Sequence, residues 1–172
     1  MSPAPAISGT PVLIFDTGPL WELVLYSVVH TLRFDSLRGE LRHLRTRSSY
    51  QTVSEFVASF QRKTTTSYVV AEISSWIRRG TERKGQSAIW GVVYQEFSSM
   101  GMDEGILKLL EMPQDLVAEI GAVDVSVLKL GLSLSQAKPL VLSIDSELIA
   151  ECNHAGVKAK DLWEVIAEGV RR

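Results

Sequence analysis

The stretch Pro11-Val12-Leu13-Ile14-Phe15-Asp16-Thr17-Gly18-Pro19 decides the fold. A short apolar run bounded by turn residues is typical of a buried strand. Pro19 suits the first turn of a helix, and apolar residues recur at helical spacing from Leu20 to Val28. The chain is therefore predicted to open with a strand, a tight turn and a helix, and Asp16 stands where the strand ends.

A second apolar run of the same kind, 139–144, ends at Asp145. Helices are predicted at roughly 36–46, 51–62, 67–80, 86–98, from near 124, up to 156 and at 161–168, with a short strand at 157–160. A break is expected at 101–105, and the mixed stretch 104–121 leaves helix and strand both open. Strands that alternate with helices favour an α/β fold with a mainly parallel sheet.

Length and composition indicate one globular domain over 11–172, with a helical, arginine-rich elaboration at about 33–66. Residues 1–10 are small and proline-rich, so we expect them to be poorly ordered. The single cysteine, Cys152, excludes an intrachain disulfide and a cysteine-rich zinc site. No apolar run reaches the roughly 18 residues of a membrane span, and no signal peptide is recognisable. A cytoplasmic protein without a membrane partner is the expectation.

Four acids stand out by their positions. Asp16 and Asp145 each follow a predicted buried strand, and functional groups in parallel α/β sheets gather at the carboxyl ends of strands. Glu72 lies within an apolar helical stripe, where an uncompensated carboxylate is costly, and Asp124 begins a helix. Asp16 and Asp124 can also be read as ordinary helix caps and Glu72 as a helix-surface residue. Glu119 is the nearest rival of Asp124.

Other chemistries fit poorly. The triplet Asp16-Thr17-Gly18 also occurs in aspartic proteases, but those need a second such triplet, which this chain lacks. A phosphoaspartate phosphatase needs an aspartate where Gly18 stands, and no glycine-rich phosphate loop of the P-loop kind is present.

Four segments resemble the PIN-domain ribonucleases, a family that includes the VapC-type toxins of toxin–antitoxin pairs. The matching segments are Leu13-Ile14-Phe15-Asp16-Thr17-Gly18-Pro19-Leu20, Tyr68-Val69-Val70-Ala71-Glu72-Ile73, Asp124-Val125-Ser126-Val127-Leu128 and Val141-Leu142-Ser143-Ile144-Asp145. The order Asp, Glu, Asp, Asp is the family order. Two departures are the long gap between Asp16 and Glu72 and the absence of an alanine-rich continuation after Asp124.

The resemblance implies a PIN-like three-layer α/β/α fold and metal-dependent hydrolysis of RNA phosphodiester bonds. The implied catalytic residues are Asp16, Glu72, Asp124 and Asp145. Of these, Asp16, Asp124 and Asp145 would be metal ligands. Clustered carboxylates repel one another unless cations neutralise them, and hard oxygen ligands suit Mg²⁺ or Mn²⁺. Thr17 and Ser143 would support the acids through hydrogen bonds, although Ser143 can also be a neutral strand residue.

Partners follow from the same resemblance and from the arginines. Arg38, Arg42 and Arg45 have the spacing of one helical face, which could contact RNA phosphates or could be a solvated or partner-binding face. The four tryptophans are spread along the chain and are expected to pack in the core. An antitoxin protein and a homodimer are further possible partners. The role as toxin, RNA-processing or defence nuclease stays open, and the alternative function is a non-catalytic PIN-like scaffold that binds RNA or protein.

Overall fold

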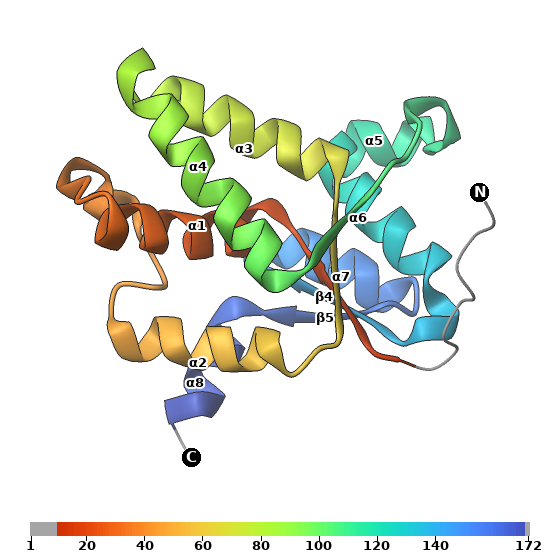
Figure 1. Ribbon diagram of the computed structural model, residues 1–172. Helices are drawn as coiled ribbons and strands as arrows, with labels where there is room; N and C mark the ends of the chain where they lie inside the picture. Colours follow the sequence, from red (N-terminus) through yellow and green to blue (C-terminus); the bar gives the residue numbers. More distant parts are fainter. Residues whose placement is uncertain (1–9, 171–172) are drawn as a thin grey trace, which may run out of the picture.

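The computed structural model describes residues 10–170 and contains one five-stranded sheet in the order β3-β2-β1-β4-β5 (Figure 1). All four strand pairs are parallel. The strands are β1 (Val12–Phe15), β2 (Arg62–Thr66), β3 (Met102–Gly105), β4 (Pro139–Ser143) and β5 (Lys158–Asp161). The poorly ordered segment predicted for 1–10 lies, apart from Thr10, outside the described residues.

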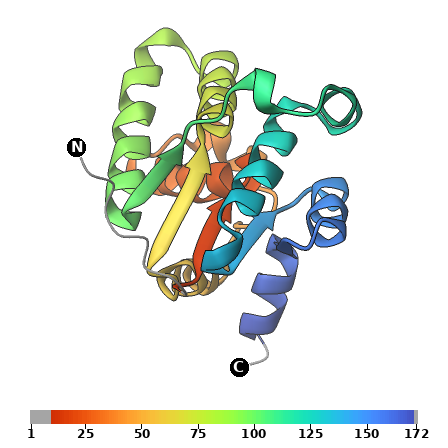
Figure 2. The same ribbon diagram turned by 90° about the vertical axis from the view of Figure 1, so that its right-hand side faces the viewer.

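Helices cover both faces of the sheet. They are α1 (Thr17–Thr31), α2 (Arg47–Ala58), α3 (Ser67–Gly80), α4 (Arg83–Met100), α5 (Gln114–Ile120), α6 (Ala122–Ser133), α7 (Ser146–His154) and α8 (Leu162–Val170), with 3-10 turns η1 (Asp35–Glu40), η2 (Leu109–Glu111) and η3 (Ser135–Ala137). Helices α1, α3 and α4 pack together on one side, whereas α6 and α7 lie on the other (Figure 2). The expected three-layer α/β/α architecture with a parallel central sheet is confirmed.

Strand β1 forms the middle of the sheet. Its four residues are fully buried and pair with β2 on one side and β4 on the other. A strand covered by helices on both faces reads as a continuous apolar run, which is why 11–15 and 139–144 were recognisable in the sequence. Both of those strand predictions are confirmed. Phe15 is in register with Leu142, so the two strands end side by side.

The polar stretch 62–66 is a strand, β2, which the sequence analysis did not predict. The helix predicted at 51–62 ends earlier, at Ala58. Threonine is β-branched and fits a pleated strand, but its hydroxyl hides the burial that an apolar run would reveal. Thr65 is fully buried, and its hydroxyl donates to the carbonyl oxygen of Phe15 over 3.0 Å. The segment 33–66 is therefore only partly the helical elaboration that was expected.

The helix predicted at 36–46 is wrong. The chain forms only the short turn η1 and then runs irregularly until α2 begins at Arg47. The buried carboxylate of Glu22 on α1 explains this path, because it accepts hydrogen bonds from the backbone N–H groups of Arg42, His43 and Leu44, at 2.8 to 3.3 Å, and contacts the His43 ring nitrogen Nδ1 at 3.1 Å. These backbone groups point at Glu22 instead of continuing a helix.

The stretch 101–121 resolves into short elements. The break predicted at 101–105 contains a turn at Gly101, whose φ is +61°, followed by the edge strand β3. Asp103 and Glu104 are exposed on this strand, and charges on an edge strand discourage pairing with other chains. Within residues 10–170, none of the helices combines the length and apolarity needed to cross a membrane.

Candidate functional site

Asp16 is a buried carboxylate at the carboxyl end of β1, with only 5% of its surface exposed. It caps α1, because its Oδ1 accepts a hydrogen bond from the Thr17 backbone N–H over 2.6 Å. Its Oδ2 accepts a second hydrogen bond, also of 2.6 Å, from the Ser143 hydroxyl. The cap interpretation is therefore confirmed, and the role of Asp16 as a metal ligand stays a prediction.

Ser143 and Asp145 place the end of β4 against Asp16. Ser143 is fully buried, and besides donating to Asp16 its Oγ accepts from the Asp145 backbone N–H at 2.9 Å. Asp145 caps α7, with Oδ1 accepting from the backbone N–H groups of Glu147 and Leu148 at 2.7 and 3.1 Å. Ser143 is thus not a neutral strand residue, since it links one acid's carboxylate to the other's backbone.

Glu72 is brought to the same edge of the sheet by α3. Its Oε2 accepts a hydrogen bond of 2.7 Å from the Thr17 hydroxyl, the residue next to Asp16. Glu72 is half-buried, and the bond fixes its carboxylate toward α1. Glu72 thus lies partly exposed on α3 with its carboxylate bound, and the Thr17 hydroxyl donates to this glutamate instead of to an aspartate.

Asp124 lies in the first turn of α6 and completes the cluster. Partial burial raises its pKa to about 7, and the nearby charges of Asp16, Asp145, Glu72 and Glu147 add to the rise. Its rival Glu119 is exposed on α5. Helix α6 is held to the end of β2 by a hydrogen bond of 2.7 Å between the hydroxyls of Ser126 and Thr66.

The acids repel one another without a cation in contact. Burial raises the pKa of Asp16 to about 6; the hydrogen bonds from Ser143 and Thr17 oppose this rise, and the charges of Glu72 and Asp145 add to it. None of the ion pairs formed within residues 10–170 includes any of the four predicted acids. A concentration of uncompensated carboxylates at one sheet edge is what a bound cation would neutralise.

The donor set fits a hard divalent metal, provided that water completes the coordination. Among the described residues, no three Asp, Glu, His or Cys side chains converge as a finished ligand set. Magnesium retains several waters and is often held through only one or two carboxylates, so an open cluster of oxygen donors suits it. Burial raises the pKa of the Cys152 thiol to about 12, and the charges of Asp16, Asp124 and Glu151 add to the rise. The raised pKa disfavours the thiolate, which is the form of cysteine that binds metals.

Glu147 is a member of the acidic group that the sequence analysis missed. It is exposed in the first turn of α7, and its charge contributes to the raised pKa of Asp124. The signal was the spacing Asp145-Ser146-Glu147, which puts a second acid in the turn after the strand. Thr66 was missed as well, because β2 was not recognised.

The three predicted RNA-binding arginines do not share a helical face. Arg38 pairs with Asp35 at 2.9 Å on the exposed turn η1. Arg42 and Arg45 lie in the irregular segment before α2, and the Arg45 Nε donates to the Leu41 carbonyl oxygen at 3.0 Å. The single-face prediction is therefore wrong in geometry, although all three side chains are exposed.

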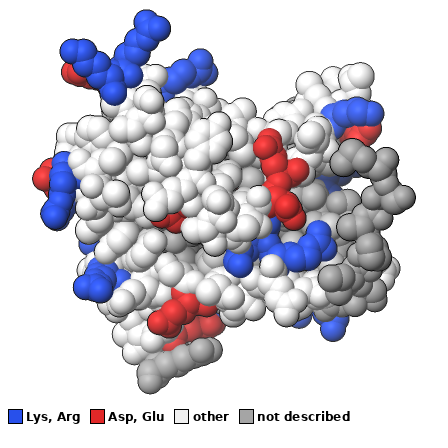
Figure 3. Space-filling model, viewed as in Figure 1, with Lys and Arg blue, Asp and Glu red and all other residues white. Residues whose placement is uncertain are grey.

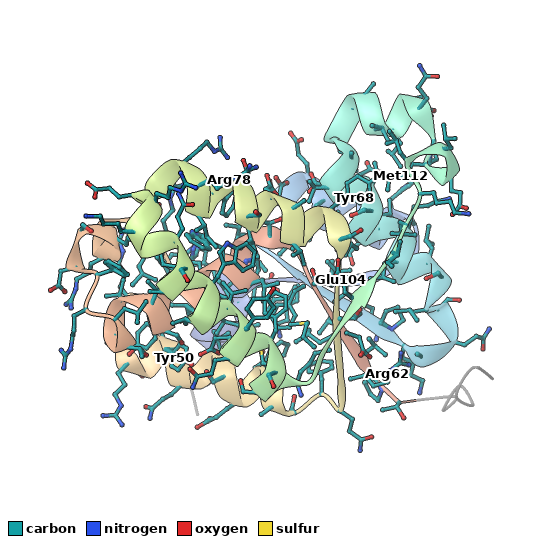
Figure 4. All side chains as sticks on the ribbon, turned by 45° about the horizontal axis from the view of Figure 1, so that its top comes forward. Tyr50, Arg62, Tyr68, Arg78, Glu104 and Met112 are labelled. Atoms are coloured by element: carbon teal, nitrogen blue, oxygen red, sulfur yellow. The ribbon has the colours of Figure 1, made fainter. Side chains whose placement is uncertain are left out.

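A cavity of about 740 Å³ is lined by Arg42 among other residues, and none of the four predicted acids is in its lining. Gly18 and Ile144, which are sequence neighbours of the acid-bearing segments, also line it. Figure 4 shows side chains along α3, with Tyr68 near its start and Arg78 near its far end. The cavity involves the far half of this helix, through Trp76 and Arg79.

Comparison with known proteins supports the fold and leaves activity open. No protein-family model matches the sequence, and no curated protein matches it. The crystal structure of PAE2754 from Pyrobaculum aerophilum is similar over 95% of this chain and 100% of that one, with a TM-score of 0.51 and 13% identity. A PilT N-terminus domain protein, SSO1118 from Sulfolobus solfataricus P2, matches over 94% of this chain and 95% of that one, at 13% identity and a TM-score of 0.43, too low to support a conclusion. The chain thus shares its three-layer α/β/α fold with PAE2754, and its parallel sheet agrees with the PIN-like fold expected from the sequence.

Proposed function

We propose that this chain is a metal-dependent endoribonuclease of the PIN type that hydrolyses RNA phosphodiester bonds. The observation that carries the proposal is the meeting of Asp16, Glu72, Asp124 and Asp145, from four separate elements, at the carboxyl edge of the sheet without a cationic partner. Electrostatic repulsion of this kind destabilises a fold, so its presence at the expected position of a functional site favours a catalytic role.

The residues divide the work according to their contacts. Asp16, Asp124 and Asp145 would hold Mg²⁺ or Mn²⁺, directly or through water. When bound, such an ion polarises the phosphodiester and lowers the pKa of a coordinated water. Glu72, fixed by the Thr17 hydroxyl, would hold the attacking water or a second ion. Ser143 keeps the Asp16 carboxylate ionised and correctly oriented by donating to its Oδ2.

Cleavage of single-stranded RNA by the purified chain in Mn²⁺ or Mg²⁺ tests the proposal. Asp16→Asn and Asp124→Asn should each lower the rate by at least about 100-fold. Glu119→Gln is the matched control, because Glu119 is an exposed acid on the neighbouring helix and should keep the wild-type rate. Equal cleavage by Asp16→Asn and the wild type would reject the assignment.

A second candidate function is a non-catalytic scaffold that binds RNA or protein. It is favoured by the long gap between Asp16 and Glu72 and by the absence of an alanine-rich continuation after Asp124. Calorimetric titration with Mn²⁺ separates the two functions, since a scaffold should show no saturable site. Binding that is lost in Asp145→Asn would exclude the scaffold.

The proposed role as a toxin rests on the resemblance of the four motifs to the PIN-domain family. The antitoxin and homodimer partners are proposed on the same ground. An antitoxin would place an Arg or Lys beside the acidic cluster, and toxin and antitoxin would act in the cytoplasm, with the chain as a homodimer. Growth arrest on expression, abolished by Asp16→Asn and relieved by the product of a small adjacent reading frame, would support this role. Normal growth with an active nuclease would point to RNA processing or defence instead.

A further inference from the structure

Helices α1 and α3 contact each other at two successive levels. At the first level the Thr17 hydroxyl binds Glu72 within the acidic cluster. Four residues further along each helix, the rings of Trp21 and Trp76 meet edge to face, with centroids 5.9 Å apart and planes at 77°. Residues four apart lie on the same side of a helix, about 6 Å apart along its axis. The tryptophan pair is therefore one helical turn from the acids.

Both tryptophans line the 740 Å³ cavity that also touches Gly18 and Ile144. Both are half-buried, and Trp21 also packs against the hydrophobic core. The expectation of core packing therefore holds for Trp21 and Trp90, but it is wrong for Trp163, which is 53% exposed. The exposed parts of the Trp21 and Trp76 rings line the cavity. Aromatic rings held in this way present flat apolar surfaces that need no ordering when a ligand binds.

Two arginines on separate segments line the same cavity. Arg42 is exposed while its backbone is fixed by Glu22, and Arg79 is exposed near the end of α3. Neither forms an ion pair with any residue between 10 and 170. Glu22 also lines the cavity, but its carboxylate oxygens accept the hydrogen bonds of the 42–44 backbone, which leaves Glu40 as the exposed acid of the lining.

The surroundings add to the positive charge. Figure 3 shows Lys and Arg side chains gathered where α3 ends and α4 begins. The residues there are Arg78, Arg79, Arg83 and Lys84, all exposed. A ligand that enters the cavity from this end therefore meets cations first and then the tryptophans, with the acids beyond. Such an arrangement favours a ligand with an anionic group attached to a flat ring.

We propose that the cavity binds one unpaired nucleotide of single-stranded RNA, next to the bond that is cleaved. Its base contacts Trp21 and Trp76, and its phosphates contact Arg42 and Arg79. This assignment rests on the proposed nuclease function for the identity of the acidic site. It selects single-stranded RNA because the base of a duplex is stacked and paired, and its flat face cannot reach an indole ring.

Fluorescence anisotropy with a labelled single-stranded RNA of about ten nucleotides tests the proposal. Metal is removed with EDTA, so that binding is measured without cleavage. Trp76→Leu should weaken binding about ten-fold and leave its salt dependence unchanged, as expected for a stacking contact. Arg42→Gln and Arg79→Gln should each reduce the slope of log affinity against log salt by about 0.7, as expected for a phosphate contact.

Matched controls and two further probes make the result decisive. Arg47→Gln removes an exposed arginine at the start of α2 that does not line the cavity, and it should keep the wild-type slope. Trp76→Phe keeps a ring and should keep most of the affinity, which guards against a folding defect in Trp76→Leu. Wild-type affinity in Trp76→Leu would overturn the proposal. Equal binding of the same sequence as a duplex, or of an abasic strand of equal length, would overturn it as well.

The experiments distinguish failure of the proposed binding site from failure of the proposed nuclease activity. Tryptophan-dependent binding of single-stranded RNA without any cleavage in Mn²⁺ would reject the proposed activity and retain this binding site. Cleavage that depends on Asp16, with RNA affinity unaffected by Trp76→Leu and Arg79→Gln, would retain the activity and reject the binding site.

Discussion

The hydroxyl of Ser143 donates to Oδ2 of Asp16 over 2.6 Å and joins the ends of two neighbouring strands. The Ser143 hydroxyl oxygen also accepts a hydrogen bond from the Asp145 backbone N–H, so one buried serine positions two acids of the cluster. Position 143 therefore connects the packing of the sheet to the electrostatics of the site.

Replacing Ser143 by alanine should raise the pKa of Asp16 above its value of about 6, because the hydrogen bond that favours the ionised carboxylate is lost. The buried carboxylate also loses a donor, which should lower the free energy of unfolding at pH 8 by about 1–3 kcal/mol. Urea unfolding measures the loss, and Ser146→Ala, an exposed neighbour, is the control. An unchanged midpoint in Ser143→Ala would show that water replaces the hydroxyl.

In EDTA, the free energy of unfolding should fall as pH rises from about 4 to about 7. The folded-state pKa values of Asp16 and Asp124, about 6 and 7, lie above the usual value of 3.8, so the folded chain binds more protons than the unfolded chain in this range. Asp124→Asn should therefore be more stable than the wild type at pH 8, by about 2 kcal/mol after allowance for solvent screening of a half-exposed group.

Urea unfolding at several pH values checks this prediction, with Glu119→Gln as the control that should keep the wild-type slope. A wild-type stability that is flat between pH 4 and 7 would mean that the acids are neutralised by something other than a removable metal. Restoring Mn²⁺ should remove most of the difference between the wild type and Asp124→Asn, because an ion that binds only the folded chain stabilises it.

Glu22→Gln should destabilise the fold by about 3 kcal/mol. The amide nitrogen of glutamine would face backbone N–H groups that now donate to a carboxylate, leaving buried donors unsatisfied. Hydrogen exchange should increase at the amides of residues 42–44, and urea unfolding gives the energy. Glu40→Gln, at an exposed position nearby, should change neither. Protection at residues 42–44 that survives in Glu22→Gln would mean that other contacts hold this segment.

Gly18→Ala should be destabilised by about 1–3 kcal/mol through overpacking. An added Cβ would lie 2.6 Å from Cδ1 of Ile144 and closer still to its Cγ1, so the Ile144 side chain must move. Ile144→Ala removes both of these atoms, and the double variant should be more stable than the sum of the two single losses predicts. A double-mutant cycle by urea unfolding measures this coupling, and additive losses would contradict it.

The strands that bear Asp16 and Asp145 were predictable because burial on both faces leaves an uninterrupted apolar run. The position of both acids at strand ends followed from that. Strand β2 was hidden because Thr64, Thr65 and Thr66 are buried yet polar. The Thr65 and Thr66 hydroxyls bind the Phe15 carbonyl oxygen on β1 and the Ser126 hydroxyl on α6, which are distant in the sequence. A search for apolar periodicity misses a buried strand whose polar side chains are hydrogen-bonded through tertiary contacts.

The arginine segment shows a different limit. Arg38, Arg42 and Arg45 have helical spacing, but the path of the chain there is set by Glu22, a residue about twenty positions earlier. Local spacing carries no information about such a distant acceptor. The same holds for the Trp21–Trp76 pair, whose contact depends on how α1 and α3 pack.

Strand β1 pairs with β4, which is synthesised much later, and this limits when the site can assemble. Strand β1 leaves the ribosome before its partner β4, and Ser143 emerges 127 residues after Asp16. Until then β1 has one exposed hydrogen-bonding edge, and Asp16 lacks its serine donor. Pairings between distant parts of a chain form late in folding. We therefore expect a nascent chain to carry no assembled acidic cluster, and any cutting activity to begin only after Ser143 and Asp145 have been synthesised.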